Sequence, residues 1–428
     1  MLQVALILLF VLILLSIPVA ASLGLLGLFL DWVYSPMPLY RALGDVAWSA
    51  LTDPLLIAIP LFVLMGEILL RSGIAERVYH ALSTWLTWLP GGLMHANIAA
   101  CTSFAAISGS TVATAATVGT VAMPQMQRHR YGPRLFLGTL AAGGTLGILI
   151  PPSINIIIYG AMTDTSIPEL YLAGFVPGLV LAGLFSLTVA GACILWPRLG
   201  GERLRFTWAE RLAALPRLLP PMVIFVIVIG SIYAGIATPT ESAALGVVSS
   251  LILAAFHRRL NLAMLRDFIE GAMQTTAMIM LIVLAAFFLN LVLAAIGLPV
   301  AVSSFVTGLD YPPFLTFLVI VALYLVLGLF LETLTLMIAT IPIIAPVVFA
   351  LGYDPVWFGI VLMLLIETAL ISPPVGLNLY VIQGVRGSGR VEDVILGATP
   401  FAGALLLMIL ILMAAPQIAL WLPQAIYR

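Results

Sequence analysis

The sequence predicts an all-α polytopic membrane protein with two re-entrant helical hairpins, arranged as an inverted repeat. Three observations support this prediction: the composition, a set of prolines that recurs at constant spacing, and the distribution of arginine. Of the 428 residues, 63% are hydrophobic and only 8% are charged, whereas a soluble domain carries about 25% charged residues. No polar stretch reaches the ~50 residues of a small soluble domain. We therefore treat residues 1–428 as a single integral membrane unit.

An internal repeat keeps its register over a long part of the chain. Rigid or polar residues recur 222 positions later, and the pairs are Pro90 and Pro312, Thr111 and Thr333, Pro124 and Pro346, Tyr131 and Tyr353, Pro133 and Pro355, Phe136 and Phe358, and Pro151-Pro152 and Pro373-Pro374. Gly- or Pro-interrupted hydrophobic segments at matching places in two halves point to the binding site of a secondary transporter. The repeat therefore predicts a transporter whose site lies where the two copies meet.

Membrane spans follow from runs of about 20 apolar residues. Such runs fall at 2–30, 53–71, 135–160, 170–196, 217–237, 241–256, 268–296, 356–383 and 396–415. The run at 2–30 exceeds the roughly 7–15 apolar residues of a signal peptide, so we expect a retained first span that bends at Pro18. Two more apolar regions, 93–126 and 312–350, are interrupted by Ser108–Thr111 and by Glu332–Thr335. Because backbone breaks at membrane depth need cover from protein or a water-filled cavity, each region predicts a re-entrant hairpin.

All seventeen basic residues are arginine. A Walker A loop needs lysine, so we expect no ATP hydrolysis, no enzyme activity, and neither ATP nor nucleic acid as a partner. Four loops are basic, and their arginines are Arg128, Arg130 and Arg134; Arg198, Arg203, Arg205, Arg211 and Arg217; Arg258, Arg259 and Arg266; and Arg386 and Arg390. With two non-crossing hairpins, the positive-inside rule places all four loops in the cytoplasm. The loops at Asp164, at Thr238–Glu241, at Asp310 and at Asp354 carry no arginine.

The same threading predicts that the second copy is inverted. Five spans separate Tyr131 from Tyr353, and an odd number of crossings turns the second copy upside down. We expect a first repeat over 53–160, with hairpin 93–126 and broken helix 135–160. The second repeat covers 268–383, with hairpin 312–350 and broken helix 356–383. Residues 170–256 form the connecting scaffold helices. Inverted repeats around a midplane site are typical of alternating-access carriers, and a channel is the less favoured alternative.

The two proline pairs predict broken helices that bind ions. Proline removes a backbone hydrogen bond from a helix, so each pair leaves free carbonyls before the break and free N–H groups after it. Carbonyls and hydroxyls suit a small cation such as Na⁺. The first predicted cation site contains Ser108, Gly109, Ser110, Gly144, Gly147, Ile150 and Pro152. The second contains Glu332, Thr333, Thr335, Glu367, Thr368, Ala369, Ser372 and Pro374. For Gly143, Gly144 and Gly147, close helix packing is an equally good interpretation.

Polar side chains near these breaks are candidate substrate contacts. They are Ser110, Thr111, Asn155, Thr333 and Asn378. The two asparagines could instead satisfy the broken helix ends. Glu332 and Glu367 are candidates for cation attraction or proton coupling, because ionisable groups at membrane depth are costly. Glu241 is predicted to be mainly structural, as an acid in the first turn of a helix, and Glu67 is explained by an i,i+4 pair with Arg71.

Four segments resemble the large membrane subunit of the tripartite ATP-independent periplasmic (TRAP) transporters. They are Ala105–Thr114, Gly144–Ser153, Ala237–Glu241 and Pro373–Asn378, and the resemblance runs from about residue 2 to residue 415. It implies an elevator-type secondary transporter in which the hairpins move against a scaffold. One departure is Ala369, which stands where the first copy has Gly147.

The resemblance also implies the function. We expect sodium-gradient-driven uptake of small organic anions, such as C4-dicarboxylates or sialic or sugar acids, across the inner membrane of a Gram-negative bacterium. A periplasmic substrate-binding protein would deliver the anion, and a separate small four-helix membrane subunit would support the carrier. The alternative is a stand-alone ion-coupled carboxylate carrier of the dicarboxylate-transporter type. Sequence alone names neither the anion nor the number of sodium ions.

Overall fold

The computed structural model consists of helices joined by short connections. It describes residues 1–202, 204–257, 260–309, 311–374 and 376–427, and within these ranges there is no strand. Arg203, Arg258, Arg259, Asp310 and Val375, which entered the predictions above, lie outside the described residues. Seven of the described helices are long and apolar enough to cross a membrane. An eighth candidate is the pair Trp208–Arg217 and Leu219–Tyr233, whose axes meet at 43°.

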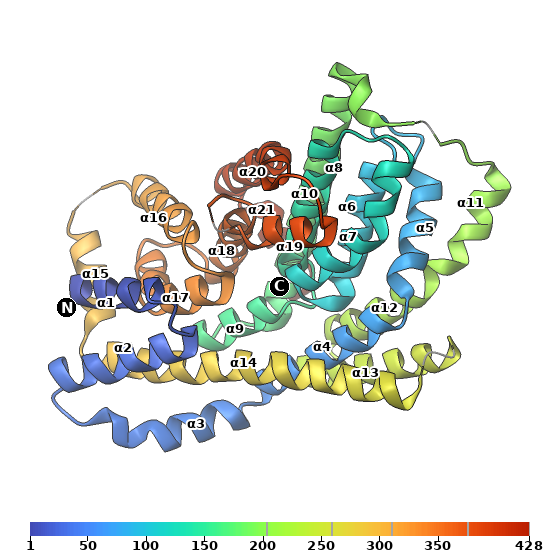
Figure 1. The fold of residues 1–428 in the computed structure, drawn as a ribbon. Helices are drawn as coiled ribbons and strands as arrows, with labels where there is room; N and C mark the ends of the chain where they lie inside the picture. The colour runs from blue at the N-terminus through green and yellow to red at the C-terminus, as the bar shows by residue number, and fades with distance from the viewer. Residues whose placement is uncertain (203, 258–259, 310, 375, 428) are drawn as a thin grey trace.

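The predicted single span over 2–30 is wrong. The segment forms two helices, α1 (Leu2–Leu14) and α2 (Val19–Tyr34), and the chain reverses direction between them (Figure 1). Ser16 between them has a left-handed backbone with φ 58°, and Pro18 lacks the N–H that a continuing helix would donate. Hydropathy alone could not show this turn, because both helices are apolar.

One layer of the structure, which we call the base layer, runs along one edge of the molecule (Figure 1). Its helices pack on one another, and they are α2, α3 (Leu43–Thr52), α4 (Pro54–Arg71), α12 (Leu219–Tyr233), α13 (Pro239–Phe256) and α14 (Leu262–Ala295). Capping side chains fix where these helices begin: Asp53 accepts a hydrogen bond from the Leu55 N–H at the start of α4. Thr238 and Glu241 form a reciprocal capping box at the start of α13, which confirms the structural role predicted for Glu241.

Two hairpins and two broken helices follow the internal repeat. The first hairpin is α6 (Leu93–Ser108) with α7 (Thr111–Arg128), and the first broken helix is α8 (Pro133–Leu149) with α9 (Ile154–Thr163). The second hairpin is α16 (Pro313–Gly328) with α17 (Thr333–Ala350), and the second broken helix is α18 (Pro355–Leu370) with α19 (Leu377–Arg386). Short helices α5 (Ile74–Leu86) and α15 (Leu298–Thr307) precede the hairpins. In Figure 1 the hairpins lie on opposite sides, with α8 and α18 between them.

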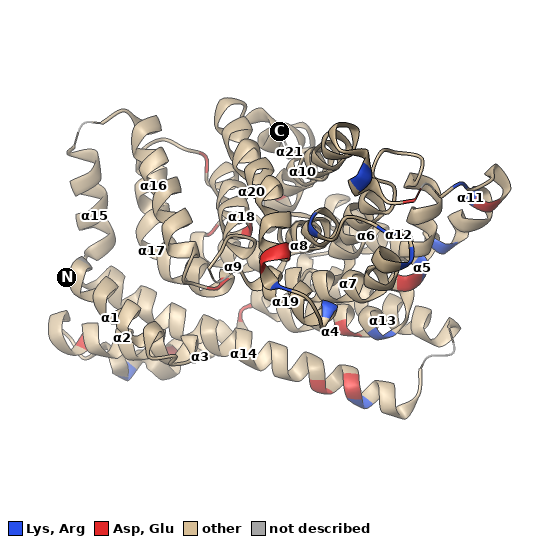
Figure 2. Ribbon diagram, turned by 45° about the horizontal axis from the view of Figure 1, so that its top comes forward, with Lys and Arg blue, Asp and Glu red and all other residues tan. Residues whose placement is uncertain are grey.

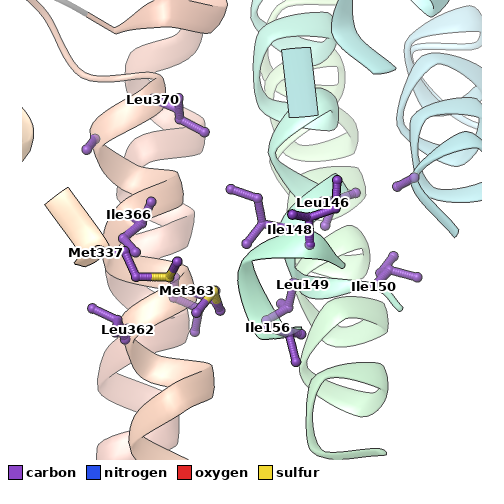
Figure 3. Packing of buried hydrophobic residues seen from close by; sticks show 14 of the residues in the cluster. Leu146, Ile148, Leu149, Ile150, Ile156, Met337, Leu362, Met363, Ile366 and Leu370 are labelled. Atoms are coloured by element: carbon purple, nitrogen blue, oxygen red, sulfur yellow. The ribbon is translucent and has the colours of Figure 1, made fainter. Parts of the chain in front are cut away.

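The two broken helices form the centre of the core. Ile148 of α8 and Met363 of α18 lie on the facing sides of these two helices (Figure 3), and both side chains are buried. Three more helices pack around this centre: α10 (Ile167–Leu195), α20 (Val391–Ala414) and α21 (Gln417–Tyr427). Within the segment 170–256, α10 therefore joins the broken helices, while α12 and α13 belong to the base layer.

Most arginines lie at one part of the molecule, and Arg41, between α2 and α3, lies apart from them. Figure 2 shows them around α5, α13, α19 and the short helix α11 (Trp208–Ala214), and shows none on α15, α16 or α17. Arg134 at the start of α8 donates to Asp393 at 3.0 Å, and Arg386 at the end of α19 lies 3.4 Å from the other oxygen of that carboxylate. This network ties α8, α19 and α20 together at their arginine-bearing ends. The gathering is the pattern that the positive-inside rule uses, and the membrane orientation stays a prediction.

Candidate functional site

A cleft of about 470 Å³ brings the tips of both hairpins together. Its walls come from both hairpins and both broken helices: Ser108–Ala113 of the first hairpin, Glu332–Leu334 of the second, Ile154 and Asn155 at the start of α9, and Leu377 at the start of α19. The base layer closes it with Gly66 and Glu67 of α4 and with Thr275, Met278 and Ile279 of α14. The meeting point predicted from the repeat is therefore a physical cleft.

The tip of the first hairpin is a two-residue break between helices. Gly109 ends α6 in a left-handed conformation with φ 60°, and Ser110 caps α7 by accepting a weak hydrogen bond from the Ala113 N–H at 3.4 Å. Glycine is the residue that adopts this φ without steric cost. The Ser108 hydroxyl lies 2.8 Å from the Thr114 hydroxyl, so oxygen atoms from both arms of the hairpin meet at its tip.

The first broken helix lies directly against this tip. A methyl group on Gly109 would lie 2.8 Å from the Pro152 carbonyl oxygen, and one on Gly147 would lie 3.0 Å from the Thr111 nitrogen. The structure thus brings Ser108, Gly109, Ser110, Gly147 and Pro152 together. Gly144 lies one turn away, where a methyl group would meet the Ala115 Cβ at 2.7 Å, and the side chain of Ile150 packs against Gly178. For Gly144 these contacts favour the packing interpretation.

The second hairpin has a different tip. Glu332 caps α17, accepting hydrogen bonds from the Thr335 N–H at 3.0 Å and from its hydroxyl at 3.3 Å. Thr333 lines the cleft, whereas Thr335 does not line it and is 1% exposed. At the base of the tip, Gly328 packs tightly against Ala369 of α18. A glycine at 369 is therefore not needed for close approach, because Gly328 supplies the space from the other side.

The hydroxyls at the second break are bonded within their own chain segment. Thr368 donates to the Leu364 carbonyl at 2.8 Å, and Ser372 donates to the Thr368 carbonyl at 2.7 Å. The Pro374 carbonyl accepts a hydrogen bond from the Tyr380 hydroxyl at 2.9 Å. None of these three residues lines the cleft. The structure therefore places Thr368, Ser372 and Pro374 at the break but outside the cleft that Glu332 and Thr333 line.

Glu367 is separated from the second tip. It is fully buried, neither carboxyl oxygen has a hydrogen-bond partner among the described residues, and its carboxyl group faces the backbone of Leu149 in α8. Ala369, two residues further along α18, is the residue that meets the second hairpin. Positions two apart project from different sides of a helix, so Glu367 points toward the first broken helix.

The two asparagines have different environments. Asn155 lines the cleft. Asn378 is fully buried, and its amide donates to the Ala141 carbonyl in α8 at 3.1 Å, linking the two broken helices. Asn155 thus retains the substrate-contact interpretation, and Asn378 fits the structural one. Thr111 also lines the cleft, with a buried hydroxyl that has no hydrogen-bond partner among the described residues.

Sequence reasoning missed the contribution of the base layer to the cleft. The Glu67–Arg71 pair is present at 3.3 Å, as predicted, but Glu67 also lines the cleft. Thr275 of α14 carried no signal, because a lone threonine in a long apolar helix is ordinary. Only the packing of α4 and α14 against the hairpins reveals these two residues.

Comparison with known proteins identifies the family. Residues 6–418 match the family described as the DctM component of the tripartite ATP-independent periplasmic transporters. The chain belongs to this family. It is therefore a transport protein of the TRAP large-permease type rather than an enzyme, and it is a multi-pass membrane protein.

Relatives cover nearly the whole TRAP permease chain. The C4-dicarboxylate TRAP transporter large permease protein DctM of Pseudomonas aeruginosa is 36% identical over 404 residues, which is 94% of each chain. The sialic acid TRAP transporter large permease protein SiaM of Vibrio cholerae is 31% identical over 86% of each chain. The isethionate TRAP transporter permease protein DctMQ of Oleidesulfovibrio alaskensis is 31% identical over 95% of this chain but only 64% of its own length.

A solved structure shares the fold. The crystal structure of the Alcanivorax borkumensis YdaH transporter, reported to have an unusual topology, superposes with a TM-score of 0.61. The match covers 95% of this chain and 98% of that chain at 15% sequence identity. At this identity the likeness supports the fold alone.

Proposed function

We propose that this chain is the carrier subunit for sodium-driven uptake of small organic anions across a Gram-negative inner membrane. Its single strongest support is the cleft in which both hairpin tips, both broken helices and the base layer meet. A site built from both copies of an inverted repeat is what alternating access requires. The relatives named for C4-dicarboxylates, sialic acid and isethionate indicate the class of substrate.

Helix N-termini provide the anion site in this proposal. Helices α7, α9, α17 and α19 begin at Thr111, Ile154, Thr333 and Leu377, and all four of these residues line the cleft. Free N–H groups and the helix dipole favour a carboxylate there. The described lining includes no arginine or histidine, so the N–H groups and the bound sodium ions supply the positive potential.

Hydroxyls and carbonyls provide the sodium sites. At the first site, the Ser108 and Ser110 oxygens and the Pro152 carbonyl lie around the same hairpin tip. Neutral oxygen ligands hold a monovalent cation without adding a buried charge. The second site uses Glu332 and Thr333 at the other tip. Sodium thereby neutralises the substrate anion before the pair crosses the membrane.

The proposed movement carries the hairpins and broken helices past the base layer as an elevator. The two groups of helices approach closely at Gly66 of α4, where a methyl group would lie 3.0 Å from the Ser108 carbonyl oxygen. A separate four-helix membrane subunit supports the base layer, and a periplasmic binding protein delivers the anion. The DctMQ relative, of which this chain spans 64%, is consistent with a fused second component in that protein.

Uptake into proteoliposomes tests the function. The purified chain, its small membrane subunit and its binding protein are combined with a radiolabelled C4-dicarboxylate, sialic acid or isethionate. We expect uptake only with an inward sodium gradient and added binding protein, and no response to ATP. Full uptake without binding protein would instead identify the stand-alone carrier, and uptake that ignores the sodium gradient would refute the coupling.

Ser110→Ala and Thr333→Ala test the sodium sites. Each change removes one oxygen from a hairpin tip, so we expect the sodium concentration for half-maximal uptake to rise about threefold to tenfold, as for loss of one polar contact. Thr120→Ala is the matched control, because its hydroxyl is on the exposed side of α7 and donates to the Ala116 carbonyl. Sodium activation curves that stay unchanged in both tip variants would reject the assignment.

A further inference from the structure

The base layer contributes a partly buried carboxylate to the cleft. Glu67 of α4 lines it together with both hairpin tips, and its side chain is 19% exposed. Helix α14 makes room for this group at Gly271, where a methyl group would lie 2.7 Å from the nearer carboxylate oxygen. Two helices thus hold the carboxylate at the cleft wall, and any larger residue at 271 would displace it.

The charge at this wall is negative. Arg71 donates to Glu67 at 3.3 Å, and the same guanidinium lies 3.8 Å from Asp267 of α14. The Arg71 guanidinium is therefore shared between the carboxylates of Glu67 and Asp267, which leaves one negative charge in excess. Thr111 also lines the cleft; the residue is 5% exposed, and its buried hydroxyl has no hydrogen-bond partner among the described residues. The excess negative charge of the Glu67 carboxylate suits a small cation at this wall of the cleft.

The position of Glu67 along α4 fixes the side of the membrane on which it acts. The arginine distribution places the Arg71 end of α4 in the cytoplasm. The cleft residues of this helix, Val63, Gly66, Glu67 and Leu70, belong to its cytoplasmic half. Because α4 is part of the base layer, Glu67 stays in place when the hairpins move. Glu67 therefore shares the cleft with the hairpin tips only in the cytoplasm-facing state.

We propose that Glu67 receives the coupling sodium ion from the hairpin tips in the cytoplasm-facing state and promotes its release. This inference rests on the proposed sodium-driven function. A fixed carboxylate beside the tips lowers the energy of an ion that has left the neutral oxygen ligands of the first tip, so this ion departs in two small steps. On the opposite side of the membrane the tips are away from Glu67, and sodium binding there does not involve it.

Internal sodium provides the test. Sodium inside the proteoliposomes rebinds to the cytoplasm-facing site and inhibits uptake. In Glu67→Gln we expect the half-inhibitory internal sodium concentration to rise about fivefold, as for loss of one charge close to the ion in a partly screened site. The external sodium concentration for half-maximal uptake should shift less than about twofold. Equal shifts on the two sides would overturn the proposal.

Matched variants separate this role from a structural one. Arg71→Gln removes the partner of Glu67 but keeps the carboxylate, so it should leave the half-inhibitory internal concentration unchanged or lower it. An increase equal to that of Glu67→Gln would show that the ion pair only braces α4, and would overturn the proposal. Glu270→Gln, an exposed acid paired with Arg266 outside the cleft, controls for surface charge.

Two further outcomes are distinct. If Glu67→Gln fails to fold, Glu67→Asp is the alternative, because it keeps the negative charge on a shorter side chain. We then expect a smaller rise in the half-inhibitory internal sodium concentration than for Glu67→Gln. Unchanged internal inhibition in folded Glu67→Asp and Glu67→Gln would refute the role of this residue alone. If the unaltered chain shows no sodium dependence on either side, the proposed function itself fails, and this inference fails with it.

Discussion

Replacing Gly109 with alanine is expected to abolish uptake while leaving folded protein in the membrane. The residue forms the tip of the first hairpin with φ 60°, and the added methyl group would lie 2.8 Å from the Pro152 carbonyl oxygen. Real Cβ atoms essentially never approach so closely, so either the tip or the proline break must move. A displacement of about 1 Å at a site costs on the order of 100-fold in rate. The initial uptake rate in proteoliposomes measures this loss.

Gly387 provides the matched control for Gly109. It has nearly the same left-handed backbone, with φ 65°, but no atom lies within 4 Å of an added methyl group. Alanine there carries the same backbone strain, roughly 1–2 kcal/mol, without the clash. We expect Gly387→Ala to retain most of its uptake. Equal losses in both variants would assign the effect to backbone strain and would contradict the contact between tip and break.

The repeat could be read from the sequence because prolines fix where its helices begin. Pro133 and Pro355 are the first residues of α8 and α18, and the equivalent residues Thr111 and Thr333 begin α7 and α17. Proline is favoured at the first helical position, because its missing N–H is not needed there and its fixed φ suits a helix. These local rules do not depend on the rest of the fold, so they hold within one sequence.

The N-terminal segment shows where such rules fail. Hydropathy gives the same signal for one long span and for the two helices α1 and α2. The aromatic contact between Phe10 and Phe330, whose ring centroids are 5.7 Å apart, joins α1 to the tip of the second hairpin. A contact between residues 320 positions apart leaves no periodic pattern, and therefore could not be predicted.

The positions of the backbone breaks in the candidate site could be predicted from the sequence, whereas the directions of its side chains could not. Breaks at glycine, serine and paired prolines identify the tips, because paired prolines interrupt a helix and glycine and serine favour helix ends. The direction of a hydroxyl depends on its neighbours: Thr368 and Ser372 bond to carbonyls of their own helix or its end. Glu67 was explained by Arg71 alone, since the position of α14 beside it was unknown from the sequence.

Replacing Gly397 with alanine is expected to cause the largest loss of stability in the chain. Helix α20 crosses α8 where Gly397 and Gly138 bring the two backbones into contact. A methyl group added at Gly397 would overlap the Arg134 carbonyl oxygen. A change of side-chain rotamer cannot relieve a clash with backbone atoms, so the two helices must move apart. Separation would also pull Asp393 from Arg134, which lie 3.0 Å apart beside the crossing. We expect a cost of about 3 kcal/mol or more and a strongly lowered melting temperature in detergent.

Gly403 lies on the same helix with no atom within 4 Å of an added methyl group, which makes it the control for Gly397. Alanine at an open helical position removes backbone freedom from the unfolded chain and stabilises a helix by up to about 1 kcal/mol. Gly403→Ala should therefore melt at or slightly above the unaltered protein, in the same size-exclusion assay after heating. If Gly397→Ala melts together with Gly403→Ala, α20 does not cross α8 in backbone contact, and the packing of the central helices described above would have to be revised.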